Sequence, residues 1–287
     1  MRELSLRAPW REVAAACDRM VEWLSFTLWV RTVIDTARDI PAVVVQTIET
    51  RCPGFLPSRA NNRDHATLWH DLAAWVDHHH FAAAREGGWL DAVHHYVGRD
   101  ARADAAWSLW ETTVAEWCTK PPAEFPSFED WHGRVLAMTS QNQEQQHGVS
   151  SARFQEGVAR YLDWETLAFW VRSLAEVSQQ LPPPARATLD SELPGFWGYV
   201  ASTRPNIQSY STWLWDELLK WVENHLFSEA RDGGWLDGLR TAVRRHLRSE
   251  RTVDYWSWCA AQWAKNPPHE LPDLPAWRAA ADGYVVR

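Results

Sequence analysis

The sequence repeats itself, and this repeat limits what the chain can fold into more than any other feature. The peptide GGWLD at residues 87–91 returns 146 positions later at residues 233–237. Six tryptophans recur with the same offset, which predicts two copies of one structural unit. The pairs are Trp69 and Trp215, Trp75 and Trp221, Trp89 and Trp235, Trp110 and Trp256, Trp117 and Trp263, and Trp131 and Trp277.

Nearer the N-terminus the repeat continues with an offset of 141 residues. Residues 29–31 (WVR) match 170–172, and residues 53–55 (PGF) match 194–196. The second copy therefore carries five extra residues, which lie between Phe196 and Trp213. Residues 139–153 are polar and Gln-rich, a composition typical of linkers. We therefore expect a first repeat at 1–138, a linker at 139–153 and a second repeat at 154–287.

Tryptophan is the second unusual feature, with 21 residues in a chain of 287. A buried indole removes roughly 150 to 250 Å² from water, so aromatic packing is expected to dominate stability. Six of the seven tryptophans between residues 68 and 131 recur in the second copy, but only one of the six histidines does. This contrast favours tryptophans in the shared core over tryptophans that act as stacking platforms for sugars or bases.

The hydrophobic spacing predicts an all-α fold. The segment Val13–Arg38 is apolar on nearly every face, so it should be a central helix, and a short helix should follow Pro41. Leu68, Leu72 and Val76 mark a third helix that we expect to end at Gly87.

Trp89 should open a fourth helix after the Gly87-Gly88 turn, buried beside the third. Asp104 can cap a fifth helix, and Ser127 a sixth. The predicted architecture is a tandem duplication of a Trp-rich bundle of about six helices per copy. Its structural turn residues are Gly87, Gly88, Trp89, Gly233, Gly234 and Trp235.

Charge and composition restrict the function. A net charge of -8 argues against a general polyanion binder. The four cysteines form no close metal-binding spacing, and no phosphate loop or nucleophile elbow is present, so we expect no cofactor. The most apolar run, Met20 to Val30, is too short to span a membrane, and the N-terminus does not resemble a secretory signal. These features predict an intracellular protein of the cytoplasm or nucleus.

One group of side chains suggests metal chemistry. Imidazoles and carboxylates are ordinary ligands of divalent metals, so a metal-dependent enzyme is one alternative. Its ligands would be His78, Asp91, His94 and His95. The second copy has Asn, Arg and Thr at the positions of the three histidines. This difference favours a surface role for the histidines.

The stretch from Leu239 to Arg251 suggests a different surface. At helical spacing its arginines should form an outward basic stripe that the first copy lacks. The stripe would dock an acidic protein surface or, as a second alternative, nucleic acid. The candidate partner-binding residues are Arg240, Arg244, Arg245, Arg248 and Arg251.

The peptides REGGW at 85–89 and EARDGGW at 229–235 resemble the BH2 segment of Bcl-2-family apoptosis regulators, in which Gly-Gly-Trp also opens a short helix. The resemblance implies a helical bundle around a hydrophobic central helix. A duplicated, Trp-rich chain without catalytic motifs is also similar in style to host-modulating early proteins of avian adenoviruses. We therefore expect a non-enzymatic interaction module or adaptor for a protein partner, modulating host cell death or stress pathways.

Overall fold

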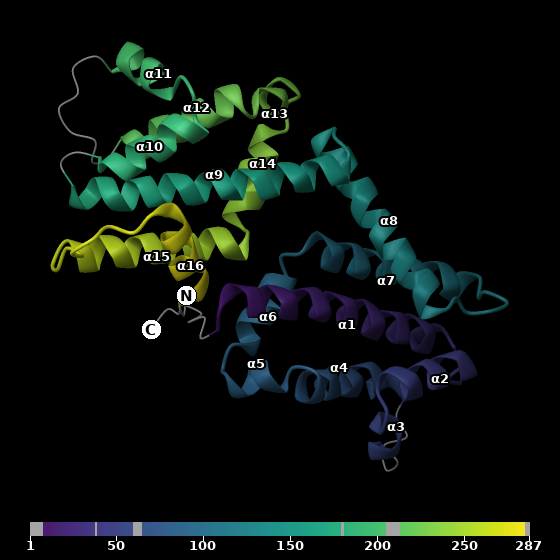
Figure 1. The fold of residues 1–287 in the computed structure, drawn as a ribbon. Coiled ribbons are helices and arrows are strands. Elements are labelled where there is room, and N and C mark those ends of the chain that lie inside the picture. Colours follow the sequence, from purple (N-terminus) through teal and green to yellow (C-terminus); the bar gives the residue numbers. More distant parts are fainter. Residues whose placement is uncertain (1–7, 38, 60–64, 179–180, 205–212, 285–287) are drawn as a thin grey trace. The chain divides into compact units, whose positions relative to one another are not determined.

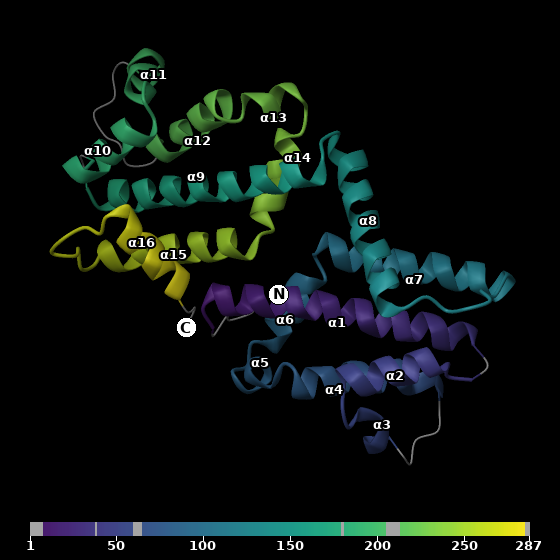
Figure 2. The ribbon, with the colours of Figure 1, turned by 45° about the vertical axis from the view of Figure 1, so that its right-hand side comes forward.

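The structure is a computed structural model, and it describes residues 8–37, 39–59, 65–178, 181–204 and 213–284. These residues form α-helices and one short 3₁₀ helix, with no strand among them. The chain divides into two compact units, Met1–Asn142 and Gln143–Val286 (Figures 1 and 2). The protein is therefore all-α, and each unit is described by itself.

Unit 1 is organised around its first helix, α1 (Trp10–Thr36), which packs against α4 (Leu68–His79), α6 (Leu90–Val97) and α7 (Ala101–Thr119). Figure 1 shows α1 running between α4 and α7. Because α1 has neighbours on several sides, Phe26, Leu28 and Trp29 are all fully buried although they point in different directions. The smaller elements are α2 (Ala42–Arg51), α3 (Phe55–Ser58), the 3₁₀ helix His65–Thr67 and α5 (Ala82–Glu86).

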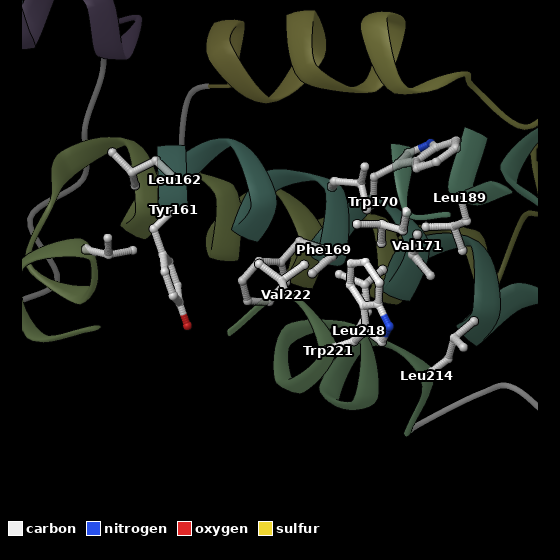
Figure 3. Close-up of a cluster of buried hydrophobic side chains, with 14 of the residues drawn as sticks. Tyr161, Leu162, Phe169, Trp170, Val171, Leu189, Leu214, Leu218, Trp221 and Val222 are labelled. Atoms are coloured by element: carbon white, nitrogen blue, oxygen red, sulfur yellow. The ribbon is translucent and has the colours of Figure 1, made fainter. Parts of the chain in front are cut away.

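Unit 2 is organised around α9 (Ser151–Val177), which packs against α12 (Leu214–His225), α14 (Leu236–Arg244), α15 (Leu247–Trp263) and α16 (Leu274–Gly283). Figure 3 shows part of this core, with Trp170 and Val171 of α9 and Leu218 and Val222 of α12. The remaining helices are α10 (Pro183–Glu192), α11 (Phe196–Thr203) and α13 (Ser228–Asp232). Half of the stretch expected to carry the five extra residues, namely 205–212, lies outside the described residues.

Several buried hydroxyl groups on the two long helices are satisfied within the helix itself. Thr32 of α1 donates to the carbonyl of Leu28 at 2.8 Å, and Ser173 of α9 donates to that of Phe169 at 2.8 Å. Thr166 does the same with Leu162 at 2.7 Å. A hydroxyl bonded to the carbonyl four residues earlier needs no other partner, so these residues can face the core at low cost.

The segment expected to be a linker is mostly helical. α8 (Phe128–His147) begins at Ser127, whose hydroxyl accepts from the Asp130 amide at 3.1 Å. Residues 139–147 continue this helix, and Thr139 is buried. The helix ends at Gly148, which has a φ of 65°. The division between the units falls inside α8, between Asn142 and Gln143.

Two predicted helix boundaries are wrong. The expected third helix stops at His79 and a separate short helix, α5, precedes Gly87. Asp100, not Asp104, caps α7, with its carboxylate accepting from the Arg102 amide at 2.8 Å. Spacing alone did not separate the two candidates, because each aspartate lies near the start of the same apolar pattern.

A tryptophan on each long helix holds a distant loop. Trp29 Nε1 donates to the carbonyl of Pro126 at 3.0 Å, and Trp170 Nε1 donates to that of Pro272 at 3.0 Å. Both indoles are buried, at 0% and 1% exposure. Each bond joins residues about a hundred positions apart, so it fixes the loop before the last helix of the unit onto the first.

Replacing Trp170 with Phe should destabilise the protein by about 1–3 kcal/mol, because the carbonyl of the half-buried Pro272 loses its donor. Urea unfolding followed by circular dichroism measures this. Trp258→Phe is the matched control, because Trp258 is 41% exposed. It should change stability by less than about 0.5 kcal/mol. An equal loss of unfolding free energy in the two variants would show that the Trp170 hydrogen bond does not contribute to stability.

Candidate interaction surfaces

The Gly-Gly-Trp peptides form tight turns that bury their tryptophans. Gly234 has a φ of 76°, and Trp235 is 8% exposed. A Cβ at Gly233 would lie 2.8 Å from the Trp235 Nε1, so the ring can fold back over the turn only if this residue is Gly. Trp89 is likewise 8% exposed, and Gly88 has a φ of 71°.

Trp235 also has a neighbour that the expected packing beside the third helix did not include. Its ring lies against the long helix α9, where a Cβ at Gly157 would come within 3.1 Å of it. The Phe154 ring of α9 lies 6.4 Å from it, centroid to centroid. The reason is that α14 packs against α9, so a residue at its start faces α9.

A cleft lies beside the second Gly-Gly-Trp turn. Its volume is about 540 Å³, and Trp235, Gly233 and Val149 line it together with charged side chains. Arg153 and Glu229 form an ion pair at its edge. The positions of these two residues in the first repeat hold Glu12 and Ala83, which cannot form this pair. The cleft edge therefore differs chemically from the matching surface of unit 1.

The histidines of the proposed metal site do not converge. His78 contacts Arg85, His94 contacts Asp77, and the His95 ring lies 5.4 Å from that of Tyr96, centroid to centroid. Asp91 is exposed in the first turn of α6. Across the described part of the chain, no three His, Cys, Asp or Glu side chains are grouped to hold a metal ion.

His94 instead forms a charge pair that has a counterpart in unit 2. Its Nε2 lies 3.1 Å from Asp77 Oδ2, and this hydrogen bond raises the pKa of the His94 imidazole. The residues at the matching positions are Arg240 and Glu223, and they form two hydrogen bonds of 2.8 and 2.6 Å. The first pair joins α4 to α6, and the second joins α12 to α14. The alignment of the two repeats shows only that His94 is replaced by Arg240, so this shared role was not predicted.

The pair in unit 2 is more extensive. The Tyr161 hydroxyl also donates to Glu223 at 2.6 Å, and Arg240 donates to Asp237 at 2.7 Å. Burial raises the pKa of Glu223, but the hydrogen bonds from Arg240 and Tyr161 outweigh it and the net shift is downward. Because an arginine stays protonated at all ordinary pH values, the Arg240–Glu223 pair remains charged over the pH range in which His94 titrates.

The predicted arginine stripe is not a single basic face. The helix expected across Leu239–Arg251 breaks between Arg244 and Leu247. Arg240 is paired as described, Arg248 donates to Asp163 at 2.8 Å, and Arg251 is 1% exposed. Arg244 and Arg245 are exposed. Helical spacing suggested one face because the break at Arg245 and His246 has no glycine or proline to reveal it.

Each unit contains an arginine held between two indoles. Arg31 Cζ lies 4.2 Å from the ring centre of Trp69 and 3.9 Å from that of Trp110. Arg172 lies 4.4 Å from Trp215 and 3.7 Å from Trp256. A carboxylate four residues later, Asp35 or Glu176, pairs with each arginine. The cation lies over the negative face of both rings, and the arginine and the two tryptophans occupy aligned positions in the two units.

Two tryptophans depart from this shared pattern because they are exposed. Trp107 of α7 is 40% exposed and Trp258 of α15 is 41% exposed, and with Leu136 they are the large hydrophobic side chains exposed among the described residues. The aligned residues in the other repeat are Val253 and Thr112. Trp107 meets Trp110 edge to face at 5.7 Å, and Trp258 stacks on Tyr255 at 5.7 Å. Each unit therefore presents an exposed indole at a position the other unit does not use.

Comparison with known proteins gives no relative from which a role could be transferred. No protein-family model matches the chain, and no curated protein or solved structure is significantly similar to it. In the described part of the chain, no helix is both long enough and apolar enough to cross a membrane.

The His94–Asp77 pair should respond to pH. The pKa of His94 is raised above the unfolded value of 6.5. Its stabilising contribution is therefore fully present below about pH 6.5 and is lost as pH rises through the folded-state pKa. NMR titration should give a His94 midpoint above 6.5, and Asp77→Asn should lower it.

The matching pair in unit 2 provides the control for this titration. Glu223→Gln should leave the His94 midpoint unchanged, because it removes a carboxylate from the other repeat. A His94 midpoint that is the same with and without the Asp77 carboxylate would contradict the assigned pair.

Proposed function

We propose that this protein is a non-enzymatic interaction module or adaptor, in which two related helical units bind different protein partners. The observation that carries the proposal is the position of the exposed indoles. Trp107 and Trp258 are exposed on helices that match in the two repeats, but at positions that do not match. Tryptophan is one of the residue types, with tyrosine and arginine, that are enriched among the residues contributing most to binding energy in protein interfaces.

The proposal includes the view that the two units are copies of one bundle. Several features support it, because residues aligned in the repeats make like contacts in both units. Each unit has a left-handed glycine before a short helix, a Gly-Gly-Trp turn, an indole bonded to a loop proline and an arginine between two indoles. The aligned positions are Gly54 and Gly195, Gly88 and Gly234, Trp29 and Trp170, and Arg31 and Arg172.

A shared core with different surfaces supports binding more than catalysis. The residues that differ between the repeats include those at the cleft edge, at the His94 position and at the exposed indoles. Several aromatic contacts inside the units are the same in both. The metal-dependent alternative needs His78, Asp91, His94 and His95 together, and all four have separate partners or are exposed. Function on a duplicated scaffold then resides in the surface residues.

The location and pathway belong to the same proposal. The four cysteines are free thiols, and burial raises the pKa of Cys52 and Cys259 to about 11, which keeps them protonated and unreactive. Free cysteines suit a reducing intracellular compartment. The proposed role in modulating host cell death or stress pathways rests on the likeness of the Gly-Gly-Trp peptides to the BH2 segment. Identifying the partner proteins tests this part of the proposal.

The proposal predicts that single substitutions divide the partners. Full-length protein carrying Trp107→Ala should lose one set of cross-linked partners from its native cell, and Trp258→Ala should lose a different set. Quantitative mass spectrometry of the two variants and the wild type measures this. Both variants should keep the wild-type circular dichroism spectrum, since neither indole is in the core. Loss of the same partners in both variants, or of none, would contradict binding by separate faces.

A further inference from the structure

We infer that the outer face of α7 binds an arginine-bearing segment of a partner protein, with Trp107 as the stacking surface and Asp104 and Glu111 as the flanking carboxylates. This inference rests on the proposed interaction function and names the chemistry of the partner at one of its faces. We call these three residues the α7 acidic-aromatic face.

The three side chains share one side of the helix. Asp104 precedes Trp107 by three positions and Glu111 follows it by four, which are the spacings of neighbours on a helix surface. All three residues are exposed, and Trp107 is 40% exposed. The carboxylates therefore lie on either side of the indole along the helix.

The carboxylates are available for a partner. Within the described part of the chain, neither Asp104 nor Glu111 forms an ion pair. The sequence from 103 to 119 contains no Lys or Arg. The nearest basic residue before this stretch, Arg102, is occupied by Asp18 and Asp100 at 2.8 and 2.7 Å. This face therefore carries negative charge that nothing on the helix neutralises.

An indole beside carboxylates fits a guanidinium better than other ligands. A planar guanidinium can stack on the ring while its N–H groups reach a carboxylate, whereas an ammonium acts as a point charge. An apolar helix would have to bury the carboxylates without partners, and a nucleic acid would be repelled by them. The protein already uses this chemistry, because Arg31 lies between Trp69 and Trp110 and pairs with Asp35.

The internal arginine does not take the place of the partner's arginine. Arg31 Cζ is 5.9 Å from the ring centre of Trp107, compared with 3.9 Å for Trp110. Its charge is balanced by Asp35 at 3.4 Å. Trp107 keeps its large exposed fraction in the presence of Arg31, so the exposed part of the ring remains open to a second guanidinium.

Unit 2 supplies the natural comparison. On α15 the residues aligned with Asp104, Trp107 and Glu111 are Glu250, Val253 and Ser257, so only the first carboxylate has a counterpart. The combination of an exposed indole with flanking carboxylates at these positions therefore belongs to unit 1. Trp258, the exposed indole of α15, is the matched control site.

The test uses full-length protein and three fluorescent nonapeptides in which glycine alternates with arginine, lysine or glutamate. Anisotropy at low salt measures affinity, and the indole N–H signals in an NMR spectrum report the site. The arginine peptide should bind most tightly and shift the Trp107 signal. Trp107→Ala should weaken its binding about threefold to tenfold, as expected for losing a cation–π contact.

Two further variants separate the site from general attraction to an acidic protein. Asp104→Asn combined with Glu111→Gln should weaken binding and reduce its salt dependence, because two charges are removed. Trp258→Ala should bind the arginine peptide as the wild type does. Circular dichroism and urea unfolding of each variant establish that it is folded.

The inference is overturned if Trp107→Ala binds the arginine peptide like the wild type, if Trp258→Ala loses as much affinity, or if the lysine peptide binds equally well. These outcomes are distinct from failure of the proposed function. Suppose that Trp107→Ala loses partners in the cross-linking experiment, but that the wild-type protein does not bind the arginine peptide. The proposed interaction function would then stand, and only the arginine-binding chemistry assigned to α7 would be overturned.

Discussion

The hydrogen bond from a buried indole on each long helix to a proline carbonyl is the contact on which the arrangement of each unit depends. Trp29 holds Pro126, and Trp170 holds Pro272, both at 3.0 Å. Each proline lies in the loop that leads into the last helix of its repeat. The indole fills the centre of the unit and satisfies a loop carbonyl at the same time, a combination that an aliphatic residue cannot provide.

This constraint accounts for the aromatic contacts that the two units have in common. The indole, the loop and the helices between them are closely packed, so a change in one of them disturbs the packing of the others. The sandwiches around Arg31 and Arg172 are limited in the same way, because both indoles and the carboxylate contact one guanidinium. Trp107 faces outward and has no such restriction, which leaves it open to a separate role.

The sequence predicted the all-helical fold and the long central helices, because a helix that is apolar on every face must be enclosed by neighbouring helices. It also located the Gly-Gly-Trp turns. It did not predict the break after His79 or the one between Arg244 and Leu247, since neither carries a glycine or proline. The arginine stripe was wrong for that reason, and because spacing does not reveal partners such as Glu223 and Asp163, which come from other helices.

The exposed indoles were missed for a related reason. A Trp-rich composition favours burial, and Trp107 lies in a helical pattern that contains buried neighbours. The available signal was the mismatch itself, because Trp107 is the one tryptophan between residues 68 and 131 without a counterpart in the second repeat. Likewise, the WVR peptide shared by residues 29–31 and 170–172 marked the arginine sandwiches, although only the structure shows which indoles enclose them.

The central claim is that the indoles divide into a shared, buried set that holds the loops and an exposed set that faces partners. Hydrogen exchange of the tryptophan indole N–H groups, followed by NMR, tests it most directly. The Trp29 and Trp170 signals should be among the slowest to exchange, since their N–H groups are buried and bonded. Those of Trp107 and Trp258 should be among the fastest. Exchange of Trp29 or Trp170 at the rate of Trp107 would contradict the claim.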